Sequence, residues 1–410
     1  MSFFTGPTRG AKGFGIKLNN EASVRPTPAE LSVVGVIHLP GSPKDQPANQ
    51  AKRVVRPQAA NRRPTMGDVA RLAGVGTMTV SRVLNGTARV SAETAERVQT
   101  AIDQLRYRPN ELARAFRGQR SRTIGLIVPY LHDPFFANCA HAVTTAAKER
   151  GYSVVITTSN EDAETEYVEA ERMLQRHVDG IAVIPSRSRQ SRLTRALFGK
   201  TPVVAFDRPV SDPGIDVVLV QNTAGSYRIV EHLIEHGHRR IAFMGLSRRL
   251  FTINARFVGY SRALLKAGMQ ENSFFGCDSP EDTLRTIKEM LGGQTPPTAF
   301  VTSNTLATLH VFSSLLSLGV KVPSEIAFVG FDDFELAALT APPLTVVRQP
   351  AQGMGRVAAE LLFDRIDTGE IPLVGNRIVL PVEMVLRRSC GCKHRVEVVI
   401  PLNVGVGTTG

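Results

Sequence analysis

One short run of side chains could read the edges of nucleic-acid bases. Thr77, Thr79 and Ser81 carry hydroxyl groups, Arg82 carries a guanidinium group, and Met78 lies among them. Hydroxyl and guanidinium groups donate hydrogen bonds to base edges and phosphates, and apolar side chains contact the methyl group of thymine. If a helix carries this run on its solvent-exposed face, the run predicts a surface that binds in the major groove of DNA.

Two short helices joined by a tight turn would position this run within residues 65–86. The apolar positions expected to be buried are spaced three and four apart in each half: Val69, Leu72, Ala73, Val80, Val83 and Leu84. Thr65 can cap the first helix, and Asp68 favours its positive end. Gly74 and Gly76 permit a sharp turn. The pattern predicts a helix-turn-helix; on this pair alone, a helical hairpin inside a core is the alternative.

A third helix and a short segment follow. Ser91 can cap a helix whose apolar stripe is Val98, Ala101, Ile102 and Leu105. Asn110 and Gly118 then bracket residues 111–117, in which Leu112, Ala113 and Phe116 would share one face. About seven residues are too few for an isolated helix, so we expect this segment to fold only against a partner chain or DNA. An ordinary linker is the alternative.

The positive charge of the chain is concentrated in its N-terminal third. The formal net charge is +12, and residues 1–121 hold 19 Lys and Arg against 8 Asp and Glu, whereas residues 122–410 hold 30 against 29. This asymmetry is typical of a nucleic-acid-binding head on a near-neutral body, although a basic tail without a partner gives the same count. Residues 1–63 lack periodicity and are expected to be a basic, disordered extension.

Composition also limits the cellular setting and the chemistry. The apolar stretches are strand-length, and no secretory signal is recognised, so we expect a cytoplasmic protein without a membrane partner. Four scattered cysteines predict no disulfide framework: Cys139, Cys277, Cys390 and Cys392. The spacing Cys390-Gly-Cys392-Lys-His394 suits no common zinc site, so we expect free thiols, no metal and no cofactor.

From Thr123 onward, strand-like runs alternate with helical patterns. The predicted strands are Thr123–Pro129, Ser153–Thr157, Gly180–Pro185, Pro202–Phe206, Asp216–Val220, Arg240–Gly245, Ala299–Thr302 and Glu325–Phe331. The predicted helices include Ala137–Arg150, Glu164–His177, Thr223–His236 and Ala255–Ala267. The alternation predicts an α/β core with parallel sheets, and its size favours two lobes. A ligand site is expected beyond the carboxyl ends of the strands.

Two other classes of function compete with DNA binding. An enzyme is disfavoured because the sequence has no P-loop, no Gly-x-Ser-x-Gly elbow and no His-Glu-x-x-His motif, so no catalytic residue is assigned. A solute-binding protein for transport fits the predicted core. The basic helical head and the missing signal sequence disfavour it.

The sequence resembles the LacI/GalR family of bacterial transcription repressors from about residue 64 to 390. The matching motifs are Asp68-Val-Ala-x-x-Ala-Gly-Val, Thr79-Val-Ser-Arg-Val-Leu-Asn-Gly, Leu105-x-Tyr-x-Pro-Asn, Asp133-Pro-Phe-Phe, His236-Gly-His-Arg-Arg-Ile-Ala, Arg256-x-x-Gly-Tyr and Val329-Gly-Phe-Asp-Asp. The resemblance implies a helix-turn-helix domain over 64–108, a hinge helix and linker over 109–121, and an effector-binding and dimerisation core over 122–389. Residues 390–410 would be a C-terminal tail. The core would be two-lobed, like a periplasmic binding protein.

The resemblance also implies roles at the DNA. A homodimer would read a near-palindromic operator in double-stranded DNA, with one head on each half-site. Thr77 and Met78 would read bases, Arg82 would reach a guanine or a phosphate, and Ser81 and Asn85 would fix the register. The remaining implied DNA contacts are Thr79, Asn110, Ala113 and Phe116. Phe116 replaces a leucine that is usual in the family, and we hypothesise that it wedges into the operator centre.

The effector site implied by the resemblance lies between the core lobes and would take a small sugar or sugar acid. Its residues are Tyr130, Asp133, Phe135, Asp207, Asn222, Arg256, Asn304, Asp332 and Gln349. Aspartate and asparagine at strand ends also serve as ordinary helix caps. Asn304-Thr305 departs from the usual Asn-Asp, and Gly76 replaces the usual serine at the second helix. Arg248 and Arg249 are either a solvated pair or a preference for acidic sugars.

The implied mechanism links effector binding to DNA binding. An effector in the cleft would change the angle between the lobes and the spacing of the paired hinge helices. The family resemblance allows the effector to act either as an inducer or as a corepressor. No heptad repeat follows Arg388, so a dimer is expected rather than a tetramer.

Overall fold

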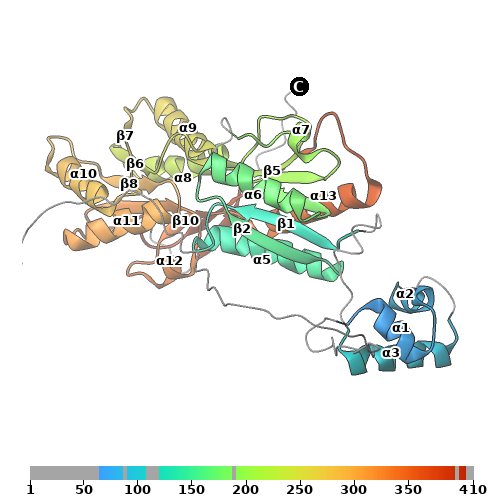
Figure 1. Cartoon of the computed structure of the whole chain (residues 1–410). Helices are drawn as coiled ribbons and strands as arrows, with labels where there is room; N and C mark the ends of the chain where they lie inside the picture. The colour runs from blue at the N-terminus through green and yellow to red at the C-terminus, as the bar shows by residue number, and fades with distance from the viewer. Residues whose placement is uncertain (1–63, 86–89, 108–119, 187–190, 393–396, 403–410) are drawn as a thin grey trace, which may run out of the picture. The chain divides into compact units, whose positions relative to one another are not determined.

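The computed structural model describes residues 64–85, 90–107, 120–186, 191–392 and 397–402. These residues form a three-helix head and an α/β core, each of which is described separately (Figure 1). The expectations for the extension 1–63 and for Asn110, Ala113 and Phe116 lie outside the described residues. No helix in the described ranges is long and apolar enough to cross a membrane.

The head consists of helices α1 (Met66–Ala73), α2 (Thr77–Asn85) and α3 (Ala92–Leu105). Thr65 and Asp68 form a reciprocal capping box: Thr65 Oγ1 accepts from the Asp68 amide at 3.4 Å, and Asp68 Oδ2 accepts from the Thr65 amide at 2.9 Å. Gly74 ends α1 with φ of 64°, the left-handed conformation that favours glycine. The predicted caps at Thr65 and Ser91 are both confirmed.

The core of the head differs from the predicted pattern at one position. Its buried members are Val69, Ala70, Ala73, Val80, Val98, Ala101 and Tyr107. Leu72, which we expected to be buried, is 51% exposed. At 100° per residue, the buried face of α1 is centred between Val69, Ala70 and Ala73, and Leu72 lies outside that arc. The packing of α2 and α3 decides which side of α1 is buried, and residue spacing alone does not determine this.

The first lobe is built on a six-stranded parallel sheet. Its strands are β1 (Thr123–Val128), β2 (Ser153–Thr158), β3 (Gly180–Val183), β4 (Val203–Phe206), β5 (Asp216–Val220) and β11 (Arg377–Leu380), in the order β11-β5-β4-β3-β1-β2. Its helices are α5 (Pro134–Glu149), α6 (Ala163–Gln175), α7 (Arg195–Phe198) and α13 (Ala351–Thr368). All its strand pairs are parallel, as predicted.

The second lobe has a seven-stranded sheet in the order β13-β12-β10-β9-β8-β6-β7. Its strands are β6 (Ile241–Gly245), β7 (Asn272–Phe275), β8 (Ala299–Thr302), β9 (Ala327–Phe331), β10 (Thr345–Arg348), β12 (Glu383–Leu386) and β13 (Val398–Pro401). Its helices are α8 (Asn222–Glu235), α9 (Phe251–Lys266), α10 (Pro280–Gly292), α11 (Thr305–Ser317) and α12 (Glu335–Leu339). Strand β12 is antiparallel to both β10 and β13.

The chain crosses between the lobes three times, so neither lobe is one continuous segment. It leaves the first sheet after β5, returns to it in α13, and leaves it again between β11 and β12. Helix α13 packs against α5 and the first sheet, although it follows β10 of the second. Figure 1 shows the two sheets with their helices around them.

The segment after residue 389 is more structured than the expected tail. Val398–Pro401 pairs with β12 as the edge strand β13, and Leu402 is buried. Residues 398–402 of the expected tail therefore belong to the second lobe. A run of four residues is too short to predict a strand from the sequence. This segment forms a strand because the exposed edge of β12 offers it a hydrogen-bonding partner.

Candidate functional site

A cavity of about 620 Å³ lies where the carboxyl ends of strands from both lobes meet. Tyr130 and Asp133 follow β1, Asp207 follows β4, Asn304 follows β8, and Asp332 follows β9. Residues placed after parallel strands converge at one edge of a sheet, and this is the usual ligand position in such folds. The volume is in the range of small-molecule sites.

Arg256 on α9 is held rigidly at the floor of the cavity. Its side chain is 2% exposed; Nε donates to Asn222 Oδ1 at 2.8 Å, and Nη1 donates to the Ser303 carbonyl at 2.7 Å. The guanidinium lies 3.6 Å from Asp332 Oδ2 and 3.8 Å from the centre of the Phe331 ring. Burial lowers the pKa of Arg256, and the charge of Asp332 opposes this effect. Four partners from three parts of the fold, namely α8, the end of β8 and the end of β9, therefore fix its orientation.

Two aspartates beside Arg256 have left-handed backbone conformations. Asp207 has φ of 63° and Asp332 has φ of 77°, and each directly follows a buried strand. This conformation is uncommon outside glycine and concentrates at functional sites. It turns both side chains into the cavity at the strand ends. Gln349 Nε2 donates to Asp332 Oδ1 and links β10 to this edge.

Asp133 combines the two roles that the sequence suggested for it. It caps α5, where Oδ1 accepts from the Phe135 amide at 2.9 Å, and it also lines the cavity. Burial and the negative charge of Asp332 raise the pKa of Asp133 to about 6. Asn304 likewise caps α11 and lines the cavity.

Arg208 and Glu161 are cavity residues that the sequence interpretation missed. Arg208 is buried and makes a two-pronged ion pair with Glu161, with Nη1 2.6 Å and Nη2 2.8 Å from its carboxylate oxygens. Arg208 Nη1 also donates to the carbonyls of Pro185 and Ser186. Burial raises the pKa of neighbouring Asp207 to about 6, and the positive charge of Arg208 opposes the rise. The adjacency of Asp207 and Arg208 was the available signal.

Four cavity residues have buried polar atoms without a hydrogen-bond partner among the described residues. They are Asp207 Oδ1, Arg208 Nε, Gln349 Oε1 and Thr305 Oγ1. Buried polar atoms are nearly always paired, so groups that stay unpaired at a cavity wall point to a polar ligand or to water. The oxygens of Asp207 and Gln349 accept hydrogen bonds, Arg208 Nε can only donate, and the threonine hydroxyl can do both.

The structure gathers eight of the nine predicted effector residues on this cavity: Tyr130, Asp133, Phe135, Asp207, Arg256, Asn304, Asp332 and Gln349. Asn222 does not line it but holds Arg256 from behind. The two neighbouring arginines separate: Arg249 lines the cavity, whereas Arg248 lies 4.3 Å from the centre of the Phe257 ring in a different hollow. They are therefore not a pair directed at one ligand.

The predicted DNA face of α2 is only partly buried. Thr77, Met78 and Arg82 are exposed, with Met78 at 68%, while Thr79 and Ser81 are half-buried. Val80 on the opposite side is fully buried in the core of the head. Asn85 ends the helix, and its side chain lies outside the described set. The run that suggested base contacts therefore lies on an accessible helix face.

A helix-turn-helix head together with a two-lobed core, whose cavity is lined by apolar and buried charged side chains, defines a ligand-responsive DNA-binding regulator. A model of the lacI family of bacterial regulatory proteins matches residues 65–110, and a periplasmic binding protein-like domain matches residues 230–390. Similar proteins include the transcriptional repressor PurR of Mannheimia succiniciproducens, 31% identical over 79% of this chain and 98% of that protein. PurR of Aliivibrio fischeri is 33% identical over 74% and 91%.

Solved structures give the same result. The Lac repressor dimer bound to operator and the anti-inducer ONPF matches with a TM-score of 0.70 and 26% identity over 80% of this chain and 99% of that one. The complex of the transcriptional regulator CelR with cellobiose matches with a TM-score of 0.59 and 33% identity over 80% and 100%. The chain belongs to the LacI family of bacterial regulatory proteins. It is a DNA-binding transcriptional repressor and not an enzyme.

Proposed function

We propose that this repressor binds a near-palindromic operator as a homodimer and that a small molecule in the core cavity controls its affinity. The proposal is supported by two observations: α2 has an exposed face that carries hydroxyl and guanidinium groups, and four buried polar atoms at the core cavity lack a hydrogen-bond partner among the described residues. Thr77 and Met78 contact bases, Arg82 reaches a guanine or a phosphate, and Ser81 and Asn85 set the register. Thr79 completes the contact surface on α2.

Phe116 and its neighbours form the second part of the DNA contact. We propose that Asn110 and Ala113 approach the DNA beside Phe116, which inserts into the operator centre as an apolar wedge. The resemblance of the sequence carries this step. Operator affinity and DNA bending should both fall in Phe116→Ala, whereas Phe116→Leu should retain them. Unchanged bending in Phe116→Ala would remove the wedge role.

The DNA contact can be tested with two variants of equal charge. Arg82 lies on the exposed face of α2, and Arg97 lies on α3 and is exposed. Arg82→Ala should lower affinity for the operator at least tenfold more than Arg97→Ala, because only Arg82 is assigned to base or phosphate contacts. A mobility shift on the promoter of its own gene, run at several salt concentrations, measures this. Equal losses for the two variants would show that charge alone acts.

The effector is proposed to be a neutral, polyhydroxylated molecule of the sugar type. Cavity-lining acids outnumber arginines: Asp133, Glu161, Asp207, Asp278 and Asp332 against Arg208, Arg249 and Arg256. Two of these arginines are already paired with carboxylates inside the site. A ligand hydroxyl can donate to the unpaired oxygens of Asp207 and Gln349, whereas a ligand carboxylate would be repelled by them. The CelR complex with cellobiose shows this ligand class in a similar fold.

Isothermal titration can separate the ligand classes. The probes are cellobiose and other neutral sugars, the corresponding sugar acids, and free purine bases as planar nitrogen ligands. A neutral sugar should bind most tightly, and tightest binding by a sugar acid or a purine would overturn the sugar proposal. Asn222→Ala should weaken the best ligand about tenfold, because Arg256 loses a hydrogen bond to a charged group. Asn254→Ala is the control, since Asn254 accepts from Arg248 outside the cavity.

Control of DNA binding follows from thermodynamic linkage. Asp133, Asp207 and Phe135 belong to the first lobe, whereas Arg256 and Asp332 belong to the second. A ligand that contacts both sets favours one angle between the lobes, and DNA selects an angle through the hinge. Effector and operator must therefore change each other's affinity by the same factor. Equal effector affinities with and without operator would contradict the proposed control.

A further inference from the structure

A cluster of sulfur and imidazole groups lies in the second lobe, away from the effector cavity. Cys392 Sγ is 2.9 Å from His232 Nε2, 3.3 Å from His236 Nε2 and 3.0 Å from Cys390 Sγ. The nitrogen and sulfur atoms of His232, His236 and Cys392 all lie within 4.8 Å of one another. None of these four residues lines the effector cavity.

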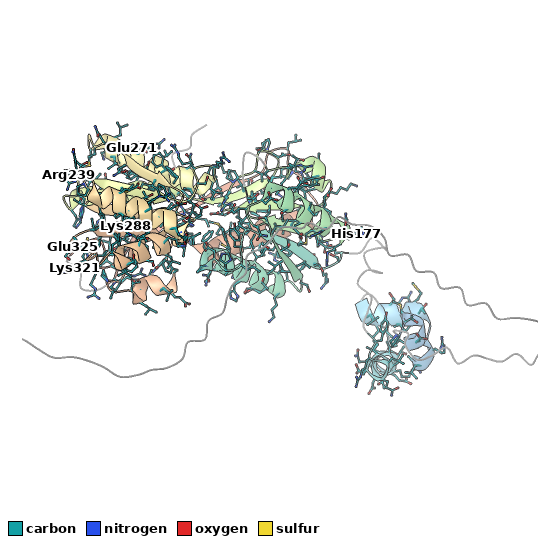
Figure 2. All side chains as sticks on the ribbon, turned by 60° about the vertical axis from the view of Figure 1, so that its left-hand side comes forward. His177, Arg239, Glu271, Lys288, Lys321 and Glu325 are labelled. Atoms are coloured by element: carbon teal, nitrogen blue, oxygen red, sulfur yellow. The ribbon has the colours of Figure 1, made fainter. Side chains whose placement is uncertain are left out.

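Two elements far apart in the sequence build this cluster. His232 and His236 are four residues apart, at the C-terminal end of α8, so their side chains share one helix face. The cysteines lie 154 to 160 positions later, in the segment after β12. Arg239 donates to the Ile234 carbonyl and therefore lies near the same end of α8. Figure 2 shows Arg239 on the outside of the second lobe and His177 at the opposite end of the core.

Both elements hold their ligand atoms in place. Ser389 Oγ donates to the Phe328 carbonyl at 2.6 Å and accepts from the Thr345 amide at 2.8 Å, so the cysteine segment is anchored to the sheet. His236 Nδ1 is 2.8 Å from the His232 carbonyl oxygen. A protonated Nδ1 that donates to this carbonyl leaves the lone pair of Nε2 directed at Cys392, which is the usual outer contact of a metal-binding histidine.

The donor set matches a common metal site. Two thiolates and two imidazoles are the Cys₂His₂ ligands of structural zinc, and the charges of two thiolates neutralise a divalent ion inside a protein. Tetrahedral zinc separates sulfur from nitrogen by about 3.6 Å and sulfur from sulfur by about 3.8 Å, given its bond lengths. The contacts of Cys392 Sγ with His232, His236 and Cys390 are shorter than these values by less than 1 Å. Cys390 Sγ lies outside the group of three donor atoms that come within 4.8 Å of one another. Small rotations of His232, His236 and Cys392 would therefore open the cluster to an ion. Cys390 would turn toward the ion from its contact with Thr345 Oγ1 at 3.2 Å.

We propose that His232, His236, Cys390 and Cys392 bind one divalent transition-metal ion, with zinc as the expected metal. Binding joins the end of α8 to the segment that leads into β13. Each thiol gives up its proton, so one Zn²⁺ replaces two protons and the site stays neutral. His236 is exposed while Cys390 and Cys392 are buried, and this provides an entry path to a closed site.

The sequence did not reveal this site. The expectation of free thiols came from Cys390, Cys392 and His394, whose spacing fits no common zinc site, and His394 lies outside the described residues. The two histidines of α8 become visible as ligands only when the second lobe folds. None of the four cysteines, all of which lie in the described ranges, forms a disulfide.

Cobalt provides a direct probe. Untagged protein is stripped with a chelator, kept reduced and titrated with Co²⁺, whose intense visible absorption reports tetrahedral thiolate coordination. One equivalent should bind, with release of about two protons. Zinc should displace cobalt stoichiometrically and raise the melting temperature. Absence of the tetrahedral thiolate spectrum, or more than one equivalent without saturation, would overturn the proposal.

Variants locate the metal and exclude a disulfide. His236→Gln keeps an exposed amide and should lower metal affinity at least tenfold, and Cys392→Ser should abolish the cobalt spectrum. His238→Gln is the control, because His238 contacts Thr298 Oγ1 at 3.1 Å and lies outside the cluster. Thiol titration of the denatured protein should find four free cysteines. A count of two, from a Cys390–Cys392 disulfide, would contradict metal binding, as would a normal spectrum in Cys392→Ser.

Discussion

Replacing Asp133 with asparagine should stabilise the ligand-free core near neutral pH. In the folded protein, burial and the charge of Asp332 raise the pKa of Asp133 to about 6, whereas an unfolded aspartate titrates near ~3.9. The fold therefore prefers the protonated carboxyl. The folded protein therefore has its full stability below the pKa of Asp133 in the unfolded chain. Stability is lost as the pH rises to the pKa of Asp133 in the folded protein, so the loss accumulates between about pH 4 and pH 6.

The size of the effect follows from the shift. Two pKa units correspond to about 3 kcal/mol, and the value is an upper limit because Asp133 lines an open cavity. We expect Asp133→Asn to gain about 1–2 kcal/mol at pH 7.5 and less than half of that at pH 4.5. The helix cap is retained, since asparagine caps helices as well as aspartate and can still accept from the Phe135 amide.

Urea unfolding followed by circular dichroism at the two pH values measures the gain. The matched control is Asp162→Asn, which replaces another aspartate cap: Asp162 accepts from the Thr165 amide at 2.8 Å on an exposed surface. The control should show no gain that depends on pH. A gain of equal size at both pH values, or no gain at pH 7.5, would refute the explanation by burial. Effector affinity should fall in Asp133→Asn, because the removed charge lines the proposed site.

Two further predictions concern packing and capping. Gly259→Ala should destabilise the core by about 1–3 kcal/mol or more, because a Cβ there would lie 2.2 Å from the Thr223 carbonyl and force α8 and α9 apart; Gly292→Ala, which meets nothing within 4 Å, is the neutral control in thermal unfolding. Thr65→Ala should cost the head about 1 kcal/mol by removing the capping box with Asp68, and should lower both the melting temperature of the head and operator affinity, whereas Thr65→Ser should preserve both.

Local sequence patterns predicted the elements that depend on local physics. The caps at Thr65 and Ser91 are as expected, because each needs only a hydroxyl ahead of a helical stretch. The eight predicted strands overlap β1 to β6, β8 and β9. Most of these strands are buried on both faces, so they read as continuous apolar runs. Charge counting also showed that the excess positive charge lies in residues 1–121.

Short and peripheral strands were missed for a different reason. Strands β7, β10, β11, β12 and β13 have four residues each, and no pattern predicted them. Strand β11 pairs with β5 about 160 residues earlier, and β12 pairs with β10 from the other side of α13 and β11. Strands β7, β10 and β13 pair with β6, β9 and β12, which precede them in the chain. A segment of this length forms a strand when a sheet edge is available, which is a property of the tertiary fold.

The candidate sites divide in the same way. The sequence by itself determined which residues follow the strand ends, and therefore which polar side chains reach the cavity, because parallel strands place their carboxyl ends at one edge. Only the tertiary structure decided how they act. In the folded protein Asn222 holds Arg256 from outside the cavity, and Arg208 pairs with Glu161. Arg248 and Arg249 lie in different hollows.

The sulfur–imidazole cluster depends on tertiary structure most completely. Its histidines and cysteines are separated by more than 150 residues, and the chain visits the first lobe between them. Sequence spacing describes neighbours within one element, whereas these groups meet because α8 and the segment after β12 pack in one lobe. The sequence thus determines the chemistry within each segment. Contacts between distant groups form only after the crossovers have brought both lobes together.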